Sequence, residues 1–436
     1  MVKISHLSKL LLLSSLALNV SALTLDEAID TALNNSTDLK KISMNVDAAK
    51  SDVKEKKSAN FGRVDLLASY THYNIARTLA PLTPASMTPD IATTQDLMSA
   101  GVAYNVELFS GMATTRSIEI AAIQKEVAKN LKKLTKEQLI YNVKTLYVNI
   151  LALKAQREAQ SLYAKALESL HKDILLRVEL GNAAKLDELK SSADLNRALS
   201  KLQEIQSNIE ILKATLASVM MVDSISDLEP ITIDLANVDM NKENYQETLA
   251  KTTKIKVAEL DIQKKEKLKE KASAMYYPKI SFSAYYGQSA GINDDTNPNS
   301  GDFENQEIWQ AGVDLKWNIF DFGKTSSLNQ KSKIAQMQSR LDSLKTKRDL
   351  ERSLSEALSK IELSIKSYES AQSELSLMEE TQKIEQLRYD NGASDINDLL
   401  YAKARYQLAK SSFINAKYNY QNAKNYLDYL LEKGQK

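Results

Sequence analysis

The sequence contains few side chains that could form a catalytic or metal-binding centre. Cysteine is absent, and the three histidines, His6, His72 and His171, are far apart in the chain. Metal binding and nucleophilic catalysis need two or more such groups at defined spacing. No phosphate-binding loop or nucleophile elbow is present either. We therefore expect no enzyme, no cofactor and no metal site, and we expect His72 and His171 to be surface or lining residues.

One group of acidic residues is placed so that it could act on ions. It lies just before Gly392 and consists of Glu379, Glu380, Glu385 and Asp390. If several copies of the chain met around an axis, inward-facing carboxylates would form a ring of like charge that repels anions and binds cations. The alternative is that these acids face outward and are solvated, as charges on a helix usually are. The adjacent Arg388 and Tyr389 could form bonds between helices that hold such a constriction closed.

The phrase around Gly392 occurs twice in the chain. RYDNGASDINDLLYAKARYQL, from residue 388 to 408, resembles RVELGNAAKLDELKSSADLNRAL, from 177 to 199. Arg177 corresponds to Arg388 and Gly181 to Gly392, so both pairs are 211 residues apart. The phrases GVAYNVELF (101–109) and GVDLKWNIF (312–320) have the same separation. Equal separations at distant points indicate an internal two-fold repeat.

Each half contains the same order of predicted elements. A charged helix (26–57 and 242–271) precedes a pair of strands with period-two alternation (63–109 and 279–322). A long helical hairpin follows, at 112–222 and 323–433. Its longer arm, at 1.5 Å per residue, would be a rod of roughly 100 Å. The apolar residues of the arms recur at three- and four-residue spacing, which predicts a coiled-coil seam; they include Ile123, Val127, Leu131 and Leu134 in one arm and Leu202, Ile205, Ile209, Leu212, Leu216 and Val219 in the other.

The two glycines are expected to supply the left-handed residue that ends each long helix. The polar residues after them, Asn182 and Ser394, are expected to cap the following helices. Asp187 and Asp398 would then lie in the first turns, where the helix dipole favours an acid.

The N-terminus reads as a secretory signal peptide. Lys3 and Lys9 precede an apolar run from Leu10 to Leu18, and small residues follow up to Ala22. The run is about half the length of a spanning helix. Removing residues 1–22 takes two of the 57 basic residues and none of the 56 acidic ones, which leaves a formal charge of −1. Such a balance does not suggest nucleic-acid binding.

These elements divide the chain into four predicted parts. They are a signal peptide (1–22), a first repeat (23–222), an irregular linker or equatorial patch (223–241) and a second repeat (242–436). The linker is distinguished by Pro230 and its β-branched residues.

Four strands per chain are too few to close a membrane barrel, for which eight is the practical minimum. An open sheet would present unsatisfied backbone groups to lipid. Either the strands fold against something soluble, as an antiparallel sheet on a coiled-coil stalk, or several chains pool their strands. The strand lengths and the aromatic residues in and beside them favour pooling, which would give eight strands in a dimer or twelve in a trimer.

At this point the sequence resembles the TolC family of outer membrane efflux and secretion channels. The matching segments are LTLDEAIDTALNNSTDL (23–39), VELFSG (106–111), WNIFDFGK (317–324) and the two turns that contain Gly181 and Gly392. The resemblance implies a mainly α fold with a transmembrane β-barrel: a homotrimer with a twelve-stranded barrel in outer membrane lipid, continuing into an α-helical coiled-coil tunnel in the periplasm. It also implies that the periplasmic end docks an adaptor, or membrane fusion protein, which links it to an inner-membrane pump.

In such a trimer the paired helix tips would form a ring of six docking points. We expect docking by eight residues at the tips: Arg177, Gly181, Asn182, Asp187, Arg388, Gly392, Ser394 and Asp398. The expected tunnel constriction consists of Glu379, Glu380, Glu385, Arg388, Tyr389 and Asp390. The function implied is the passive exit duct of a tripartite efflux or type I secretion system. The alternatives are a non-conducting trimeric adhesin or structural stalk and, less suited to the duplicated hairpins, a periplasmic adaptor. The exported substrate and the pump class remain open.

Overall fold

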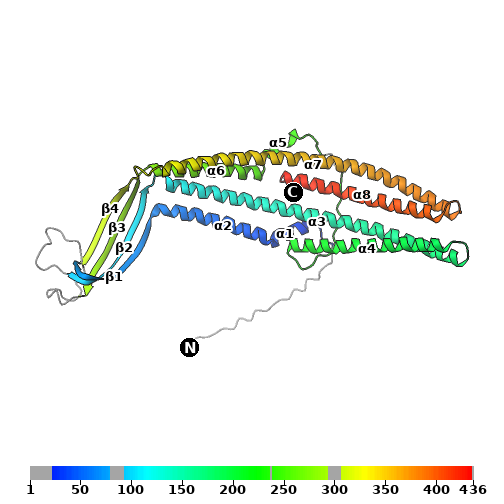
Figure 1. Ribbon diagram of the computed structural model, residues 1–436, viewed down its shortest axis with the longest axis horizontal. Helices are drawn as coiled ribbons and strands as arrows, with labels where there is room; N and C mark the ends of the chain where they lie inside the picture. Colours follow the sequence, from blue (N-terminus) through cyan, green and yellow to red (C-terminus); the bar gives the residue numbers. More distant parts are fainter. Residues whose placement is uncertain (1–21, 79–92, 236–237, 293–305, 435–436) are drawn as a thin grey trace, which may run out of the picture. The chain divides into compact units, whose positions relative to one another are not determined.

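The computed structural model describes residues 22–78, 93–235, 238–292 and 306–434 (Figure 1). The predicted signal peptide and His6 therefore lie outside the described residues, apart from Ala22, and so does most of the two predicted loops that join the strands. The chain divides into two compact units. Unit 1 comprises residues 1–39, 136–249 and 351–436, and unit 2 comprises residues 40–135 and 250–350. Each unit is described by itself below.

The two long helices have the same length. The α3 helix (Ala113–Glu179) and the α7 helix (Lys324–Asp390) have 67 residues each, and both units contain part of each helix. They are followed by α4 (Lys185–Met220) and α8 (Ile396–Leu430), which start 211 residues apart in the chain. The predicted long helical hairpins are thus present in both halves.

The predicted helices 26–57 and 242–271 are each interrupted. The first consists of α1 (Leu25–Asn35) and α2 (Thr37–Ser58), and the second of α5 (Glu243–Ala250) and α6 (Thr253–Ser273). Ser36 has an extended ψ of 119°, and its hydroxyl accepts a hydrogen bond from the Leu39 amide at 3.2 Å. A serine that caps a new helix in this way competes with continuation of the old one.

The four strands form one antiparallel sheet in the order β1-β2-β3-β4 (Figure 1). They are β1 (Arg63–Thr78), β2 (Thr93–Phe109), β3 (Lys279–Ile292) and β4 (Gln306–Lys316). Short 3-10 turns, η1 (Ala59–Phe61) and η3 (Ala274–Tyr276), precede β1 and β3. Among the described strands, β1 and β4 each have one neighbour and so form the two edges of the sheet.

A row of large apolar side chains crosses all four strands. Leu66 pairs with Val102, Val102 pairs with Tyr286, and Tyr286 pairs with Trp309. Leu66 is 80% exposed and Trp309 is 74% exposed. Because alternate residues of a strand share one face, this register gives the sheet an apolar face that the described chain leaves uncovered.

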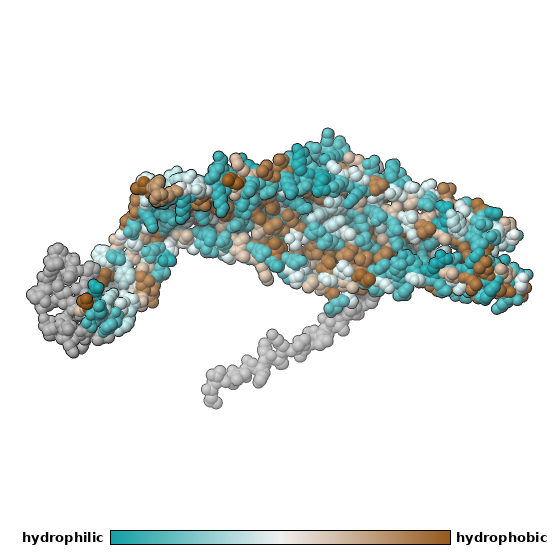
Figure 2. Space-filling model, in the orientation of Figure 1, coloured by the Kyte–Doolittle hydropathy of each residue, from teal (hydrophilic) through white to brown (hydrophobic). Residues whose placement is uncertain are grey.

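The second strand pair is shorter than the predicted range 279–322. The β4 strand ends at Lys316, which pairs with Lys279, the first residue of β3. No described strand continues beyond Lys279 to pair with Trp317 and Ile319. Both side chains are exposed, as are Phe320 and Phe322. Figure 2 shows apolar side chains at the surface where the strands meet the helices.

The largest core of unit 1 lies where α3, α4 and α1 meet. The α4 residues Ile205, Ile209 and Leu216 pack against α3 between Val143 and Leu151. These α4 residues belong to the predicted apolar stripe, and they pack on a part of α3 nearer to Gly181 than the stripe named around Ile123 and Leu134. The reason is geometric, because a hairpin that turns at Gly181 brings together residues at equal distances from the turn.

The first half of the predicted linker is held against this core. Leu23 and Leu228 form a parallel β-bridge. The hydroxyl of Tyr147 donates to the carbonyl of Leu23 or of Glu229, each at 2.7 Å. Burial raises the pKa of Tyr147 to about 12. Lys154 forms an ion pair with Asp227 at 2.9 Å, and the Lys154 hydrogen bond lowers the pKa of that carboxyl.

Within the described residues, no helix combines the length and the hydropathy needed to cross a membrane.

Candidate functional site at the helix tips

Both long helices end in the same hydrogen-bonded turn. Gly181 and Gly392 have φ of +76° and +70°, in the left-handed region. The amide of Gly181 donates to the Val178 carbonyl at 3.0 Å, and that of Gly392 donates to the Tyr389 carbonyl at 3.0 Å. The next amides donate to the carbonyls of Arg177 and Arg388, each at 2.7 Å. This pair of bonds defines a Schellman motif. The prediction that the two glycines end the long helices is confirmed.

A side chain at either glycine would meet open space. A Cβ built at Gly181 or at Gly392 has no other atom within 4 Å. A substitution there would be strained by the backbone conformation and not by collision, because L-residues other than asparagine and aspartate rarely adopt positive φ.

The prediction that Asn182 and Ser394 cap the following helices was wrong. The N-cap of α4 is Ala184, which forms no side-chain cap, and the N-cap of α8 is Asp395. The Asp395 carboxylate accepts from the amides of Asn397 at 2.7 Å and Asp398 at 3.1 Å. The Ser394 hydroxyl is buried without a hydrogen-bond partner among the described residues. The helices thus begin later than predicted, because the N-cap of α4 lies two residues beyond Asn182 and that of α8 lies one residue beyond Ser394.

Asp187 and Asp398 lie in the first turns of α4 and α8, as predicted. The backbone hydrogen bond from Asp398, followed by the bonds from Asn397, holds the pKa of the Asp395 carboxyl below its ordinary value. The second tip therefore has a charged cap at the start of its return helix, which the first tip lacks.

The two tips of one chain pack against each other. Tyr389 is buried with Leu167, Leu170 and Ile174 of α3 and Leu399 of α8. The Arg177 guanidinium lies over the Tyr389 ring, with its Cζ 5.0 Å from the ring centroid. Burial raises the pKa of Tyr389. The two return helices are also in contact, because Lys190 Nζ of α4 donates to Asn397 Oδ1 of α8 at 2.9 Å. Two residues that the sequence named separately, Arg177 and Tyr389, are thus in contact across the two hairpins.

Three of the four acids of the predicted constriction have partners on their own helix. The pairs are Glu379 with Lys383 at 3.0 Å, Glu385 with Arg388 at 2.7 Å, and Asp390 with Gln386 at 3.0 Å. The bond from Lys383 to Glu379 raises the pKa of Lys383. One oxygen of Glu385, Oε2, is buried without a hydrogen-bond partner in the described structure. The ion pairs with Lys383 and Arg388 reduce the charge that Glu379 and Glu385 can present to an ion, whereas the Gln386 amide is neutral and does not offset the charge of Asp390.

Arg388 bonds within its own turn. Its Nη1 donates to Glu385 and its Nη2 to the Ala393 carbonyl, at 3.4 Å. Within the described chain the contact between hairpins is instead made by Tyr389, through Arg177. Of the two residues expected to bond between helices, only Tyr389 does so here.

Two polar residues near the helix tips are buried, which was not predicted from the sequence. Lys403 on α8 is 8% exposed, and burial lowers its pKa, while the charge of Asp390 acts in the opposite direction. Gln407, one turn farther along, donates to Gln160 Oε1 at 3.0 Å, so that α8 and α3 share a buried amide bond. Their burial could have been predicted from spacing, because Lys403 and Gln407 follow the buried Leu399 at intervals of four residues and so lie on the same helix face.

The two described histidines are not part of a metal site. His72 Nδ1 lies 2.8 Å from Asp96 Oδ1, and His171 Nδ1 lies 2.8 Å from Ser191 Oγ. In the part of the chain that the structure describes, no group of three or more histidine and acidic residues could hold a metal ion.

A model of the family described as "Outer membrane efflux protein" matches residues 28–220 and 244–432. The two matched segments leave out the linker around Pro230 and together include most of the chain. They also include both helix tips. A comparison with curated protein sequences gave no match.

Solved structures share the fold at low sequence identity. A membrane protein from Pseudomonas aeruginosa has a TM-score of 0.80 at 16% identity, covering 93% of this chain and 90% of its own. The CmeC outer membrane channel of Campylobacter jejuni has a TM-score of 0.76 at 17% identity, covering 94% and 86%. The open state of the MtrE outer membrane channel of Neisseria gonorrhoeae has a TM-score of 0.76 at 17% identity, covering 94% and 89%.

Proposed function

The chain belongs to the outer membrane efflux protein family, and from this premise we propose that it is the passive exit duct of a tripartite efflux or type I secretion system. Proteins of this family are outer membrane channels that extend into the periplasm, so this protein is located there and is not an enzyme. Beyond this family membership and location, we propose how the chains assemble, which partners they bind and what the helix tips do.

In the proposed assembly, three chains pool their strands. The observation that supports it most directly is the four-stranded sheet with two unpaired edges and an exposed apolar face. Open edges in lipid leave backbone groups unsatisfied, whereas a closed barrel satisfies them all. Three copies provide twelve strands, which is within the range of known barrels.

The internal repeat suggests how neighbouring chains pair. Within the chain, Val102 of β2 pairs with Tyr286 of β3. Val313 corresponds to Val102 at a separation of 211. Because Val102 pairs with Leu66 and Val313 pairs with Phe282, Leu66 corresponds to Phe282 at a separation of 216, and Tyr70 corresponds to Tyr286. The same contact between chains would therefore place Val313 of β4 opposite Tyr70 of β1 in the next chain. In this register Leu66 lies opposite Trp317, so the neighbour would extend β4 beyond Lys316.

The duplicated organisation also supports the predicted parts of the chain. We propose a first repeat at 23–222, a linker at 223–241 and a second repeat at 242–436, behind a signal peptide that ends at Ala22. The equal lengths of α3 and α7 and the matching turns at Gly181 and Gly392 support this division.

The helix tips are the proposed docking surface for a periplasmic adaptor that connects the channel to an inner-membrane pump. Around Gly181 the large exposed apolar residues are leucines, at positions Leu176, Leu180, Leu186 and Leu189. Around Gly392 they are Ile384, Leu387 and Tyr401. Uncovered apolar side chains grouped at the end of a helical hairpin are typical of a protein interface. With two tips per chain, a trimer would present six such ends.

The acids before Gly392 are proposed to line the constriction of the tunnel at this end. Because Glu379 and Glu385 form ion pairs on their own helix, we expect Glu380 and Asp390 to contribute most of the unpaired charge. Block of conductance by divalent cations should weaken when Glu379, Glu380, Glu385 and Asp390 are all replaced by their amides. Unchanged block in that variant would show that these acids do not face the conduction path.

The duct function is tested with the purified protein in planar lipid bilayers. A duct gives discrete conductance steps, and the same preparation should retain the adaptor in a pull-down. The alternative function, a trimeric adhesin or structural stalk, would give neither result. Family membership favours the duct.

A further inference from the structure

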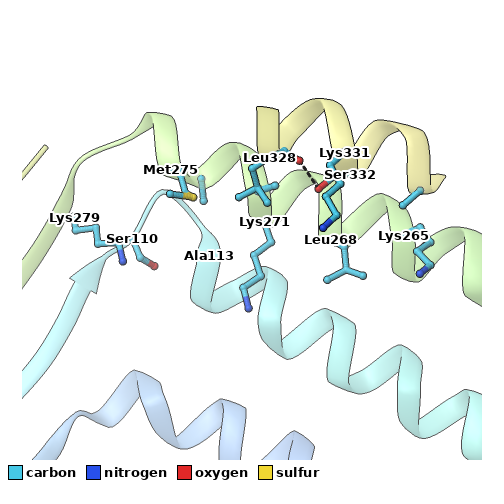
Figure 3. Close-up of a pocket in the computed structure, with 13 residues that line it drawn as sticks. Ser110, Ala113, Lys265, Leu268, Lys271, Met275, Lys279, Leu328, Lys331 and Ser332 are labelled. Carbon is cyan, nitrogen blue, oxygen red and sulfur yellow. Dashed lines mark hydrogen bonds between the residues drawn. The ribbon is translucent and has the colours of Figure 1, made fainter. Parts of the chain in front are cut away.

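Unit 2 contains a pocket where the strands end and the helices begin. Its volume is about 490 Å³, within the range of about 300 to 1,000 Å³ that is usual for small-molecule sites. The lining side chains come from α6, α7, the start of α3, Ser110 after β2 and Lys279 at the start of β3 (Figure 3). Strand and helix ends thus contribute to one cavity.

The wall of the pocket is apolar. The large residues that line it are Leu268 and Met275 from the α6–η3 segment and Leu328 from α7, with alanines between them. Each of the three is more than a third exposed, so the described chain leaves this apolar surface open to a ligand. No carboxylate is among the lining residues.

Four lysines also line the pocket, at positions Lys265, Lys271, Lys279 and Lys331. Within the described residues none of the four has an ion-pair or hydrogen-bond partner for its ammonium group. Neighbouring lysines on the same helix behave differently. Lys264 pairs with Asp261 at 2.9 Å, and Lys267 pairs with Glu270 at 3.1 Å. The lysines that line the pocket therefore have no counter-charge among the described residues, and they are spread along it from Lys279 to Lys265 (Figure 3).

The place of the pocket in the fold indicates what surrounds it. The protein is located in the outer membrane, and Lys279 is the first residue of β3, one of the strands proposed to form the membrane barrel. The pocket therefore lies beside the membrane surface that faces the helices. Lysines at such a surface lay their apolar stems along the hydrophobic region and direct their ammonium groups to lipid headgroups. Clustered basic residues favour anionic headgroups over zwitterionic ones.

We propose that this pocket binds one anionic phospholipid. The acyl chain would lie on Leu268, Met275 and Leu328, and the lysines along the pocket would supply the positive charge that attracts the phosphodiester. The combination of unpaired positive charge and uncovered apolar wall fits a ligand that is both anionic and apolar. A free phosphate would leave the apolar wall uncovered, and a neutral lipid would leave the lysines without a counter-charge. The proposal goes beyond the duct function and depends only on the location in the outer membrane.

The experiment is native mass spectrometry of the full-length protein with defined lipids. Phosphatidylglycerol should remain bound at collision energies that remove phosphatidylethanolamine. Replacing the four lysines by glutamine should reduce the retained phosphatidylglycerol about tenfold. A matched control replaces four exposed lysines outside the pocket, Lys57, Lys333, Lys345 and Lys347, and should retain the lipid.

A second variant tests the apolar part of the site with all lysines present. Ala335→Phe adds a ring to the pocket wall and should also remove the retained lipid. Glycerol phosphate, which has the headgroup chemistry without acyl chains, should not compete. Equal lipid loss in the pocket and control lysine variants would mean general surface attraction and would overturn the proposal. It would also be overturned by equal retention of both lipids, or by full retention in Ala335→Phe. Conductance can be normal in every one of these cases, so failure of this site is distinguishable from failure of the duct function.

Discussion

Tyr389 joins the two hairpin ends because it is both a buried ring and the partner of a cation. Its exposure is 8%, and Arg177 from the other hairpin lies over its face. Removing a buried aromatic ring usually costs about 3–5 kcal/mol, and a partly buried cation–π contact adds on the order of 1 kcal/mol. The contact therefore holds the tips together more strongly than the local bonds of Arg388 do.

The double variant Tyr389→Ala with Arg177→Gln should separate the two tips. We expect a higher single-channel conductance, because the hairpins could then move apart at the constriction. Tyr389→Phe should conduct like the parent, since the ring and its face remain. Arg388→Gln should have little effect, because its bonds lie within one turn. If the double variant conducts like the parent, the tip contact does not restrict the channel.

The turn glycines make a second prediction at the residue scale. Gly181→Val and Gly392→Val force a β-branched residue into the left-handed region, which costs roughly 1–3 kcal/mol at each site. The strain is local, so adaptor binding in a pull-down should be lost while the protein still assembles and inserts. Gly312→Val is the matched control, because a Cβ at Gly312 also meets nothing within 4 Å and its φ is not positive. Normal adaptor binding by both tip variants would contradict the docking role.

At the scale of the element, the two return helices differ in their caps. Asp395 caps α8, whereas Ala184 leaves α4 uncapped. Asp395→Ala should raise hydrogen exchange of the Asn397 and Asp398 amides by about fivefold, since such a cap contributes about 1 kcal/mol. Ala184→Asp should slow exchange at the start of α4. Unchanged exchange in both variants would show that capping does not limit opening of these helices.

The α8 cap should also depend on pH. The pKa of Asp395 is lowered in the folded protein, so the cap stabilises α8 fully at pH values above the unfolded pKa, about 3.9. The stabilisation is lost as pH falls through the lower, folded pKa. Hydrogen exchange at Asn397 and Asp398 should therefore speed up, relative to other amides, below about pH 4. In Asp395→Asn this change with pH should be absent.

The sequence predicted elements better than it predicted contacts between them. Periodicity and the paired glycines located the long helices and their ends, because these depend on neighbouring residues. The break at Ser36 was missed, since one serine that bonds to Leu39 is enough to divide a helix with an otherwise continuous pattern. The bond between Gln407 and Gln160 could not be predicted, because their partnership depends on how α8 packs on α3.

At the scale of the whole molecule, the uncovered surfaces of the single chain support the proposed assembly. Leu66 and Trp309 are largely exposed on the sheet, and the strand edges are unpaired among the described strands. The proposed assembly also accounts for the shortened β4, because a strand whose partner belongs to another chain ends where its own chain stops pairing with it.

The proposed register between chains can be tested with disulfides, because the parent has no cysteine. Directly opposed residues on antiparallel strands have Cβ atoms about 4.5–5.5 Å apart, and the closer, non-hydrogen-bonded pairs allow a disulfide. Tyr70→Cys with Val313→Cys and Ser69→Cys with Asp314→Cys are adjacent pairs in this register, so one of them is the closer kind. On oxidation, that double variant should migrate as a covalent trimer in a denaturing gel. Tyr70→Cys with Gly312→Cys is the control, because Gly312 faces the other side of the sheet and should not link. Linked dimers without trimers would indicate a two-chain barrel of eight strands, and absence of linking in both test pairs would mean that the repeat does not determine how neighbouring chains pair.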